Sequence, residues 1–171
     1  MQRYLFVLTA VAVLCSTVTA AQNTSPLKSY WCEERIDYFG TATEAGQKAA
    51  VEAFGCKLSR LEGYVFINEQ PGAVALELYW SDERQDNATI ASEETKAELL
   101  ASGYRKTASE GYIYSTEQPG TVPLKLFFNK NMNEYYSTTP QTGEKAAMDE
   151  GFEFIRIEGY IMPAEGKEDS K

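Results

Sequence analysis

Hydrophobic and polar positions alternate in three similar stretches of the chain, each ending in two aromatic residues. These stretches are residues 27–31, 76–80 and 124–128. A period of two is typical of strands, and one face of each strand must then point to a core. The side chains expected on that face are Leu27, Trp31, Leu76, Leu78, Trp80, Leu124, Leu126 and Phe128.

A second short strand and then a helix are predicted after each of these stretches. The second strands cover residues 37–41, 86–90 and 134–138, and the helices roughly 44–54, 93–102 and 140–150. The predicted N-caps are Thr43, Ser92 and Thr139, since hydroxyl side chains accept hydrogen bonds from the free N–H groups of a first turn. Gly55, Gly103 and Gly151 are expected to end the helices in the left-handed conformation.

The tripeptide Glu-Gly-Tyr recurs every 48 residues, beginning at Glu62, Glu110 and Glu158. A fixed internal period is the signature of a repeat, and one such unit cannot bury its own apolar face. The pattern predicts one domain over residues 21–163, with repeats at about 26–72, 73–120 and 121–163. The fold class expected is α+β, a pseudo-threefold domain of short antiparallel strands with one short helix per repeat, closed around a common core.

The first twenty residues have the form of a secretory signal peptide. Arg3 precedes the apolar run 4–15, and the small residues 18–20 place the cleavage after Ala20, or alternatively after Ala21. The protein is therefore expected to be secreted and extracellular. Residues 164–171 are charged without an apolar pattern, which predicts a disordered tail.

Two cysteines remain after cleavage, Cys32 and Cys56. An oxidising compartment favours their pairing, and closing the 24-position loop should stabilise the fold by roughly 3 kcal/mol. Asn23 and Asn87 begin the two N-glycosylation sequons.

Charge and composition exclude several kinds of function. The net charge is −9, which disfavours nucleic acid and anionic membranes as partners. The chain has no histidine, so catalysis with an imidazole base and histidine-ligated zinc are excluded. Asp82, Glu83 and Asp86 lack the spacing of a calcium loop and indicate a solvated acidic loop. We expect no metal, no cofactor and no enzymatic activity.

The sequence resembles a repeat of unknown function found in secreted bacterial and fungal proteins. The unit of that family opens with Pro-Leu-Tyr-Arg-Leu-Tyr, continues with Asp-His-Phe-Tyr-Thr and closes with Gly-Tyr-Val-Tyr. Residues 122–127, 37–41 and 111–114 match these segments, and the resemblance spans about residues 26–163. The family's histidine is Tyr38 in this chain. The Glu-Gly pair of the family's closing segment is replaced by residues 59–60, 107–108 and 155–156.

Three sets of equivalent residues are candidates for ligand contacts. Glu62, Glu110 and Glu158 could line a common axis, although hydrogen bonding to their own turns is the alternative that repetition favours. Tyr30, Tyr79 and Phe127 lie opposite the core leucines and could stack on sugars, unless the helices cover that face. Tyr64, Tyr112 and Tyr160 raise the same choice between core packing and binding.

These features favour a secreted, monomeric, non-enzymatic binding module, with a carbohydrate or cell-wall glycan as its ligand. A secreted factor that binds an extracellular protein through an acidic surface is the first alternative. A small hydrolase with two facing carboxylates is the second, because such a pair needs no proximity in sequence.

Overall fold

The structure, a computed structural model, describes residues 23–164. The predicted signal peptide and the predicted tail, apart from Ala164, lie outside the described residues. Within them, no helix has the length and apolar character needed to cross a membrane.

Nine strands and three short helices make up the described chain, and one helix continues as a π-helical turn. In chain order the elements are β1 (Thr24–Cys32), β2 (Asp37–Thr41), α1 (Glu44–Lys48) with its π-helical continuation (Ala49–Ala53), β3 (Lys57–Phe66), β4 (Ala73–Ser81), β5 (Asp86–Ile90), α2 (Glu93–Ala101), β6 (Arg105–Tyr114), β7 (Val122–Asn129), β8 (Glu134–Thr138), α3 (Glu144–Asp149) and β9 (Glu153–Pro163). The second strands have the predicted bounds.

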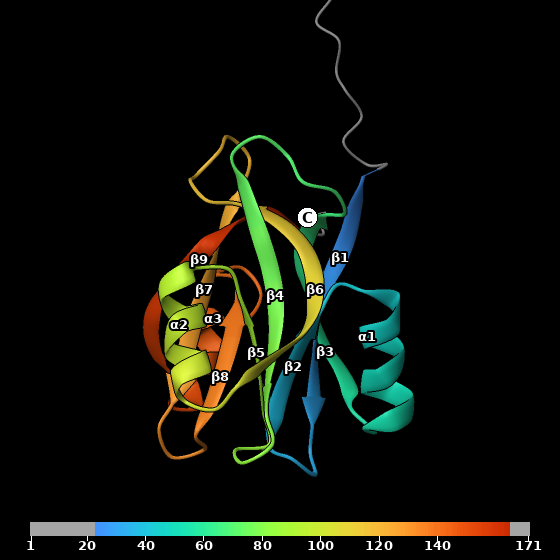
Figure 1. Cartoon of the computed structure of the whole chain (residues 1–171), viewed down its shortest axis with the longest axis vertical. Coiled ribbons are helices and arrows are strands. Elements are labelled where there is room, and N and C mark those ends of the chain that lie inside the picture. Colours follow the sequence, from blue (N-terminus) through green and yellow to red (C-terminus); the bar gives the residue numbers. More distant parts are fainter. Residues whose placement is uncertain (1–22, 165–171) are drawn as a thin grey trace, which may run out of the picture.

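All nine strands belong to one antiparallel sheet. β1 lies between β2 and β3, β4 between β5 and β6, and β7 between β8 and β9. The long strands β3, β6 and β9 also pair with one another at their far ends, which closes the sheet into a ring. The helices lie on the outside of this sheet, with α1 and α2 on opposite sides in Figure 1.

The predicted α+β, pseudo-threefold fold class is wrong, because the domain is mostly antiparallel β-sheet. Strands account for 51% of it and helices for 18%. The helical segments contribute few residues to the interior: α1 buries none, its π-helical continuation and α3 bury one each, and α2 buries three. The core is therefore built by the sheet, and the helices are short covers rather than a second layer.

Three glycines allow the ring to close. A Cβ on Gly63, Gly111 or Gly159 would collide with a main-chain carbonyl oxygen of the neighbouring long strand, at Met162, Phe66 and Tyr114 respectively. Gly63 and Gly111 also have positive φ values of 155° and 121°. Only glycine accommodates so close an approach of two backbones, which explains the glycine of each Glu-Gly-Tyr tripeptide.

Inside the ring, apolar side chains from the first and third strands of each set form the central core. They are Leu27, Val65, Leu76, Ile113, Leu124 and Ile161, each at most 2% exposed. The predicted core leucines Leu78 and Leu126 are also buried, beside the helices.

In the aromatic pairs at the ends of β1, β4 and β7, the buried residue is not the one predicted for the core. Trp31, Trp80 and Phe128 are only partly buried, whereas the preceding residues are buried. A register shift lies just before each pair, between Ser29 and Tyr30 in β1 and at the corresponding steps of β4 and β7. In each case two consecutive residues of β1, β4 or β7 oppose residues two apart in β3, β6 or β9, so the extra residue lies in the partner strand and the alternation of the first strand continues. The prediction failed in burial, because Tyr30, Tyr79 and Phe127 lie on the face that the helical segments cover.

Two of the three predicted N-caps are confirmed. The side chains of Thr43 and Ser92 accept hydrogen bonds from the main-chain N–H groups of Gly46 and Thr95. Thr139 is not a cap, since α3 begins only after Gly143 and Thr139 belongs to the preceding turn. The predicted left-handed glycines all have positive φ: they are Gly55, Gly103 and Gly151.

Both ends of the described chain lie at one end of the sheet. Thr24 pairs with Phe66 at the end of β3, and Pro163 pairs with Gly63 nearby. The tight turns from β1 to β2, β4 to β5 and β7 to β8 lie at the opposite end, at the bottom of Figure 1.

Candidate functional site

The predicted stacking aromatics are covered by the protein itself. Tyr30 and Tyr79 are 4% exposed and Phe127 is fully buried, each packed against a helix-bearing segment. The helical segments therefore cover this face, which was the alternative that the sequence left open. They leave no ring face open to a sugar.

The predicted glutamates are also buried, and each binds the segment that precedes a helix. Glu62 accepts hydrogen bonds from a set of hydroxyl and N–H groups: Ser29 Oγ, Tyr136 OH, Thr138 Oγ1, Thr139 N and Thr142 Oγ1. Glu158 binds Ala91 N, Ser92 N and Thr95 Oγ1 in a similar way. The partners belong to distant parts of the chain rather than to the glutamate's own turn.

Glu110 makes the sparsest set of these contacts. Its Oε2 accepts from Thr41 Oγ1 and from the N–H groups of Ala42 and Thr43, at 2.6–3.1 Å. Its buried Oε1 has no partner among the described residues. The three tyrosines that follow the glycines, at 64, 112 and 160, are half-buried beside the strand ring.

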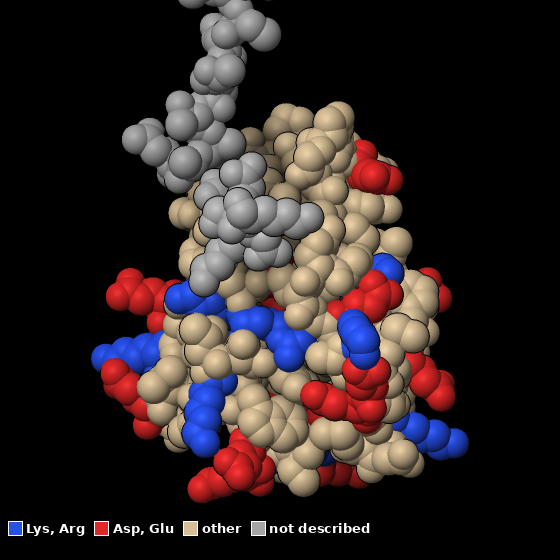
Figure 2. Space-filling view, turned by 180° about the vertical axis from the view of Figure 1, so that it is seen from behind, with Lys and Arg blue, Asp and Glu red and all other residues tan. Residues whose placement is uncertain are grey.

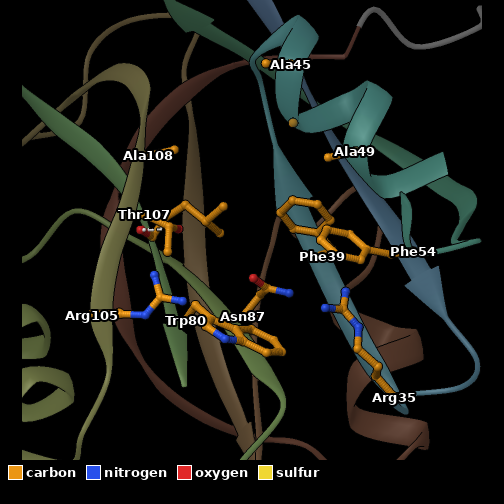
Figure 3. Close-up of a pocket in the computed structure, with 12 residues that line it drawn as sticks. Arg35, Phe39, Ala45, Ala49, Phe54, Trp80, Asn87, Arg105, Thr107 and Ala108 are labelled. Carbon is orange, nitrogen blue, oxygen red and sulfur yellow. Dashed lines mark hydrogen bonds between the residues drawn. The ribbon is translucent and has the colours of Figure 1, made fainter. Parts of the chain in front are cut away.

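The structure shows an open cleft that sequence patterns did not indicate. It lies between α1 with β2 on one side and β4 with β6 on the other, and its volume is about 400 Å³. Figure 3 shows residues of β6 on one wall and residues of the α1 segment on the other, with Trp80 and Asn87 between them. The residues that line it are Arg35, Phe39, Ala45, Gly46, Ala49, Phe54, Leu78, Trp80, Asn87, Arg105, Thr107 and Ala108.

Aromatic rings form much of the cleft. Phe54 is 44% exposed, Trp80 is half-buried, and Phe39 lies deeper, in edge contact with Phe54 at 6.2 Å between ring centroids. The Arg35 guanidinium lies 4.5 Å from the centroid of Phe54 and 5.1 Å from that of Trp80. Stacking of this kind stabilises the guanidinium's position and keeps the two rings apart.

The cleft is open because a small residue stands where two other strands carry arginine. Ala108 of β6 pairs with Leu78, as Arg60 of β3 pairs with Ser29 and Arg156 of β9 with Leu126. Arg60 lies over the rings of Tyr38 and Tyr136, at 5.9 Å from each centroid. Arg156 forms ion pairs with α2. Each arginine thus fills, beside its own strand, the space that corresponds to the open one at Ala108.

The helix wall of the cleft is also made of small residues. Arg156 binds Glu94 at 2.6 Å and Glu98 at 3.4 Å, two residues on one face of α2. Counted from the N-cap, the corresponding positions of the α1 segment are Ala45 and Ala49, which line the cleft. The arginine and its two acidic partners are therefore absent together.

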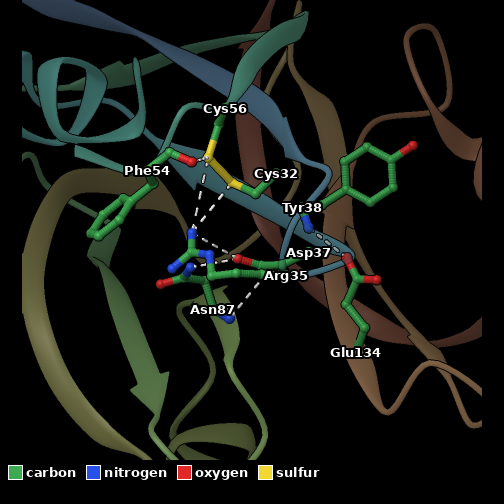
Figure 4. The surroundings of a disulfide bond; sticks show 8 residues. All are labelled: Cys32, Arg35, Asp37, Tyr38, Phe54, Cys56, Asn87 and Glu134. Atoms are coloured by element: carbon green, nitrogen blue, oxygen red, sulfur yellow. Dashed lines mark hydrogen bonds and ion pairs between the residues drawn. A yellow bond between two sulfur atoms is a disulfide. The ribbon is translucent and has the colours of Figure 1, made fainter. Parts of the chain in front are cut away.

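The disulfide, predicted and confirmed, holds Arg35 at the mouth of the cleft. Cys32 and Cys56 are bonded, and the Arg35 Nη2 donates to Cys32 Sγ at 3.3 Å and lies 3.2 Å from Asp37 Oδ2 (Figure 4). Phe54, two residues before Cys56, is fixed by the same link. The bridge thus places one cation and one aromatic ring of the cleft.

Asn87, the second predicted glycosylation site, lies in this cleft. Its side chain is 6% exposed, and its amide nitrogen donates to Asp37 Oδ2 at 2.7 Å. A glycan on this nitrogen would displace that hydrogen bond, so the folded chain offers it poorly for modification. Asn23 lies in a more accessible position and accepts a hydrogen bond from Asn68 at 2.9 Å.

Three carboxyl groups meet behind the cleft, at the first residues of the second strands. Asp37, Asp86 and Glu134 are each at most 2% exposed. Burial raises the pKa of Asp37 to about 6 and that of Glu134 to about 9, and burial with the nearby Asp37 raises the pKa of Asp86 well above its usual value. No group of three potential ligands among residues 23–164 is arranged to hold a metal ion. Asp82, from the predicted acidic loop, accepts from Trp80 Nε1 instead.

Fold and site together define a small antiparallel β-domain with an aromatic, arginine-bearing cleft. Comparison with known families assigns it more closely. Residues 37–162 match a domain of unknown function, DUF5648, and the chain belongs to that family. This confirms the resemblance to a domain of unknown function. No curated protein and no solved structure matches the chain.

Proposed function

We propose that the protein is a secreted, non-enzymatic module that binds carbohydrate in the cleft between α1 and β6. The observation that supports this most is the grouping of Phe54 and Trp80 with polar donors in one open cavity of about 400 Å³. That volume is within the range of small-molecule sites, roughly 300–1,000 Å³.

The lining has the two kinds of contact that a sugar requires. The apolar face of a pyranose packs against aromatic rings, which Phe54 and Trp80 provide. Its hydroxyl groups need hydrogen-bond partners in fixed directions, and Asn87 and Arg105 present such groups. The site therefore differs from the predicted one: the aromatic at the end of β4 that contacts the ligand is Trp80, not Tyr79.

The carboxylates are placed in a way that favours binding over hydrolysis. A glycosidase needs two carboxyl groups that flank the scissile bond, roughly 5–10 Å apart. None of the residues lining the cleft, all within the described chain, is Asp or Glu. The carboxyl groups that do meet, at Asp37, Asp86 and Glu134, are buried.

The cleft also supports a sugar ligand better than the alternative of a protein partner bound by an acidic surface. On the face seen from behind in Figure 2, acidic and basic side chains are interspersed, with a mostly uncharged region above them. Such a face lacks the single sign of charge that electrostatic docking would use.

The test is a glycan array and a pull-down on insoluble polysaccharides, with a variant that closes the cleft. Ala108→Arg restores the side chain that β3 and β9 carry at this position. Ser109→Arg is the matched control, because adjacent strand residues face opposite sides and it adds the same charge. We expect the wild type and Ser109→Arg to bind the same glycans, and Ala108→Arg to lose at least about tenfold in affinity. Absence of binding to any glycan, or equal binding by Ala108→Arg, would contradict the proposal.

A further inference from the structure

The ionisable side chains of the cleft carry one sign of charge. Arg35 and Arg105 line it, and no carboxylate does. This contrasts with a chain whose net charge is −9. The cleft is therefore locally positive on a protein whose overall charge is negative.

The two arginines enter the cleft from different walls. Arg35 comes from the turn between β1 and β2, and Arg105 is the first residue of β6. Figure 3 shows both guanidinium groups directed toward the space between the walls, with Trp80 and Asn87 between them. A ligand stacked on Trp80 would therefore have a cation on either side.

Neither guanidinium is fully used by the protein. Arg35 Nε is buried and has no partner among the described residues, while its Nη2 binds Asp37 and the disulfide. Arg105 has only a 3.5 Å contact with Asp82, and both of these side chains are more than 60% exposed. An exposed pair of this kind contributes little, so Arg105 is free to exchange Asp82 for a carboxylate of the ligand.

We propose that the cleft selects an acidic sugar, a uronic acid whose ring stacks on Trp80 and whose carboxylate binds Arg105 and Arg35. This inference rests on the proposed carbohydrate function and specifies its ligand class. Guanidinium groups match the planar carboxylate with parallel hydrogen bonds, whereas a neutral sugar offers them only single hydroxyl groups. Asn87 then faces the ring hydroxyls.

The experiment measures binding of acidic sugars against the same sugars with the charge removed. The probes are oligosaccharides of galacturonate, glucuronate and mannuronate, each beside its methyl ester. Trp80 fluorescence reports binding in a Trp31→Phe background, where Trp80 is the one tryptophan left. We expect at least one acid to bind about tenfold more tightly than its ester, and added salt to reduce that difference.

Two charge-removing variants separate the cleft from a general charge effect. Arg105→Gln should reduce the preference for the acid to threefold or less, as expected when one of the two cations is lost. Lys57→Gln removes one positive charge at the corresponding position of β3, where Lys57 pairs with Trp31 as Arg105 pairs with Trp80. It should leave the preference unchanged.

The outcomes separate this inference from the proposed function. Equal or tighter binding of the esters, or a preference that survives Arg105→Gln, would overturn the acidic-sugar inference and leave a neutral glycan as the ligand. Binding of none of these probes would also overturn it, whereas the proposed function would then depend on the neutral glycans of the array. Only the absence of binding to every glycan of the array would contradict both the acidic-sugar inference and the proposed carbohydrate function.

Discussion

At the scale of single residues, buried carboxyl groups stabilise the contacts between strands. Asp37 accepts from Asn87 N at 3.2 Å, Asp86 accepts from Tyr135 N at 3.3 Å, and Glu134 accepts from Tyr38 N. Each carboxyl group thus accepts from the main-chain N–H of the second residue of a neighbouring short strand. Together the three groups connect β2, β5 and β8. The cost is that three acids lie out of water, close to one another.

These acids should make the protein less stable as the pH rises. In the unfolded chain they ionise near pH 4, whereas in the fold the pKa of Asp37 is about 6 and that of Glu134 about 9. Between these limits the folded state holds more protons than the unfolded state, so the free energy of unfolding falls with increasing pH. We expect the melting temperature to decrease from about pH 5 to pH 9.

Glu134→Gln tests the assignment of that slope. Glutamine keeps the oxygen that Tyr38 N binds and cannot ionise, so the decrease between about pH 6 and pH 9 should become shallower. Melting curves of the wild type and the variant across this range give the measurement. Parallel curves would show that Glu134 does not carry the effect.

Glu62 should be the most sensitive of the three glutamates of the Glu-Gly-Tyr tripeptides. It is fully buried and accepts from five separate groups, so Glu62→Ala would leave several buried donors without a partner. We expect a loss of roughly 3 kcal/mol or more in the free energy of unfolding, measured by urea denaturation. Glu69→Ala, at an exposed position of the next loop, should change it by less than about 0.5 kcal/mol.

At the scale of elements, the sequence predicted the features that depend only on neighbouring residues. The second strands and the left-handed glycines follow from alternation and backbone preference, and both are correct. The burial of Tyr30, Tyr79 and Phe127 depends on cover by the helical segments, which the alternation within one strand does not encode. Trp80 is more accessible than Tyr79 because it lines the open cleft beside Ala108, whereas Tyr79 packs against Leu99 of α2.

The cleft could not be predicted for a related reason. The sequence displays Arg60, Ala108 and Arg156 at one repeated position, but their spacing does not indicate that this position faces a helix of another segment. The structure supplies that information, because Arg156 reaches Glu94 and Glu98 on α2. Once this contact is known, the small side chain of Ala108 explains why the cleft is open.

The link between the α1 segment and β1 should be sensitive to loss of the disulfide. Cys32→Ser with Cys56→Ser is expected to lower the free energy of unfolding by roughly 3 kcal/mol. It should also weaken glycan binding beyond this effect on stability, because Arg35 and Phe54 lose their common support. Urea denaturation and binding at a temperature where both forms are folded separate the two effects. An unchanged affinity would show that the bridge serves stability alone.

At the scale of the whole molecule, closure of the strand ring depends on glycine. Gly111→Ala places a methyl group against the carbonyl oxygen of Phe66 and should cost about 3 kcal/mol or more, or prevent folding. Gly120→Ala is the control: its φ is 80°, but a Cβ there meets nothing within 4 Å. It should cost about 1 kcal/mol, the strain of a left-handed alanine. Thermal unfolding of the two variants gives the measurement. Similar losses of stability would mean that the strand ring accommodates a methyl group at Gly111.

The position of the two chain ends determines how the protein can be held. Thr24 and Pro163 lie at one end of the sheet, whereas the turn that carries Arg35 and the beginning of β6 lie at the other. A linker or an affinity handle that left the fold at Thr24 or at Pro163 would therefore start at the end of the sheet remote from the two arginines. Held at Thr24 or at Pro163, the molecule would present the same orientation, with the end that carries the two arginines outward and accessible to a polymer too large to diffuse around it.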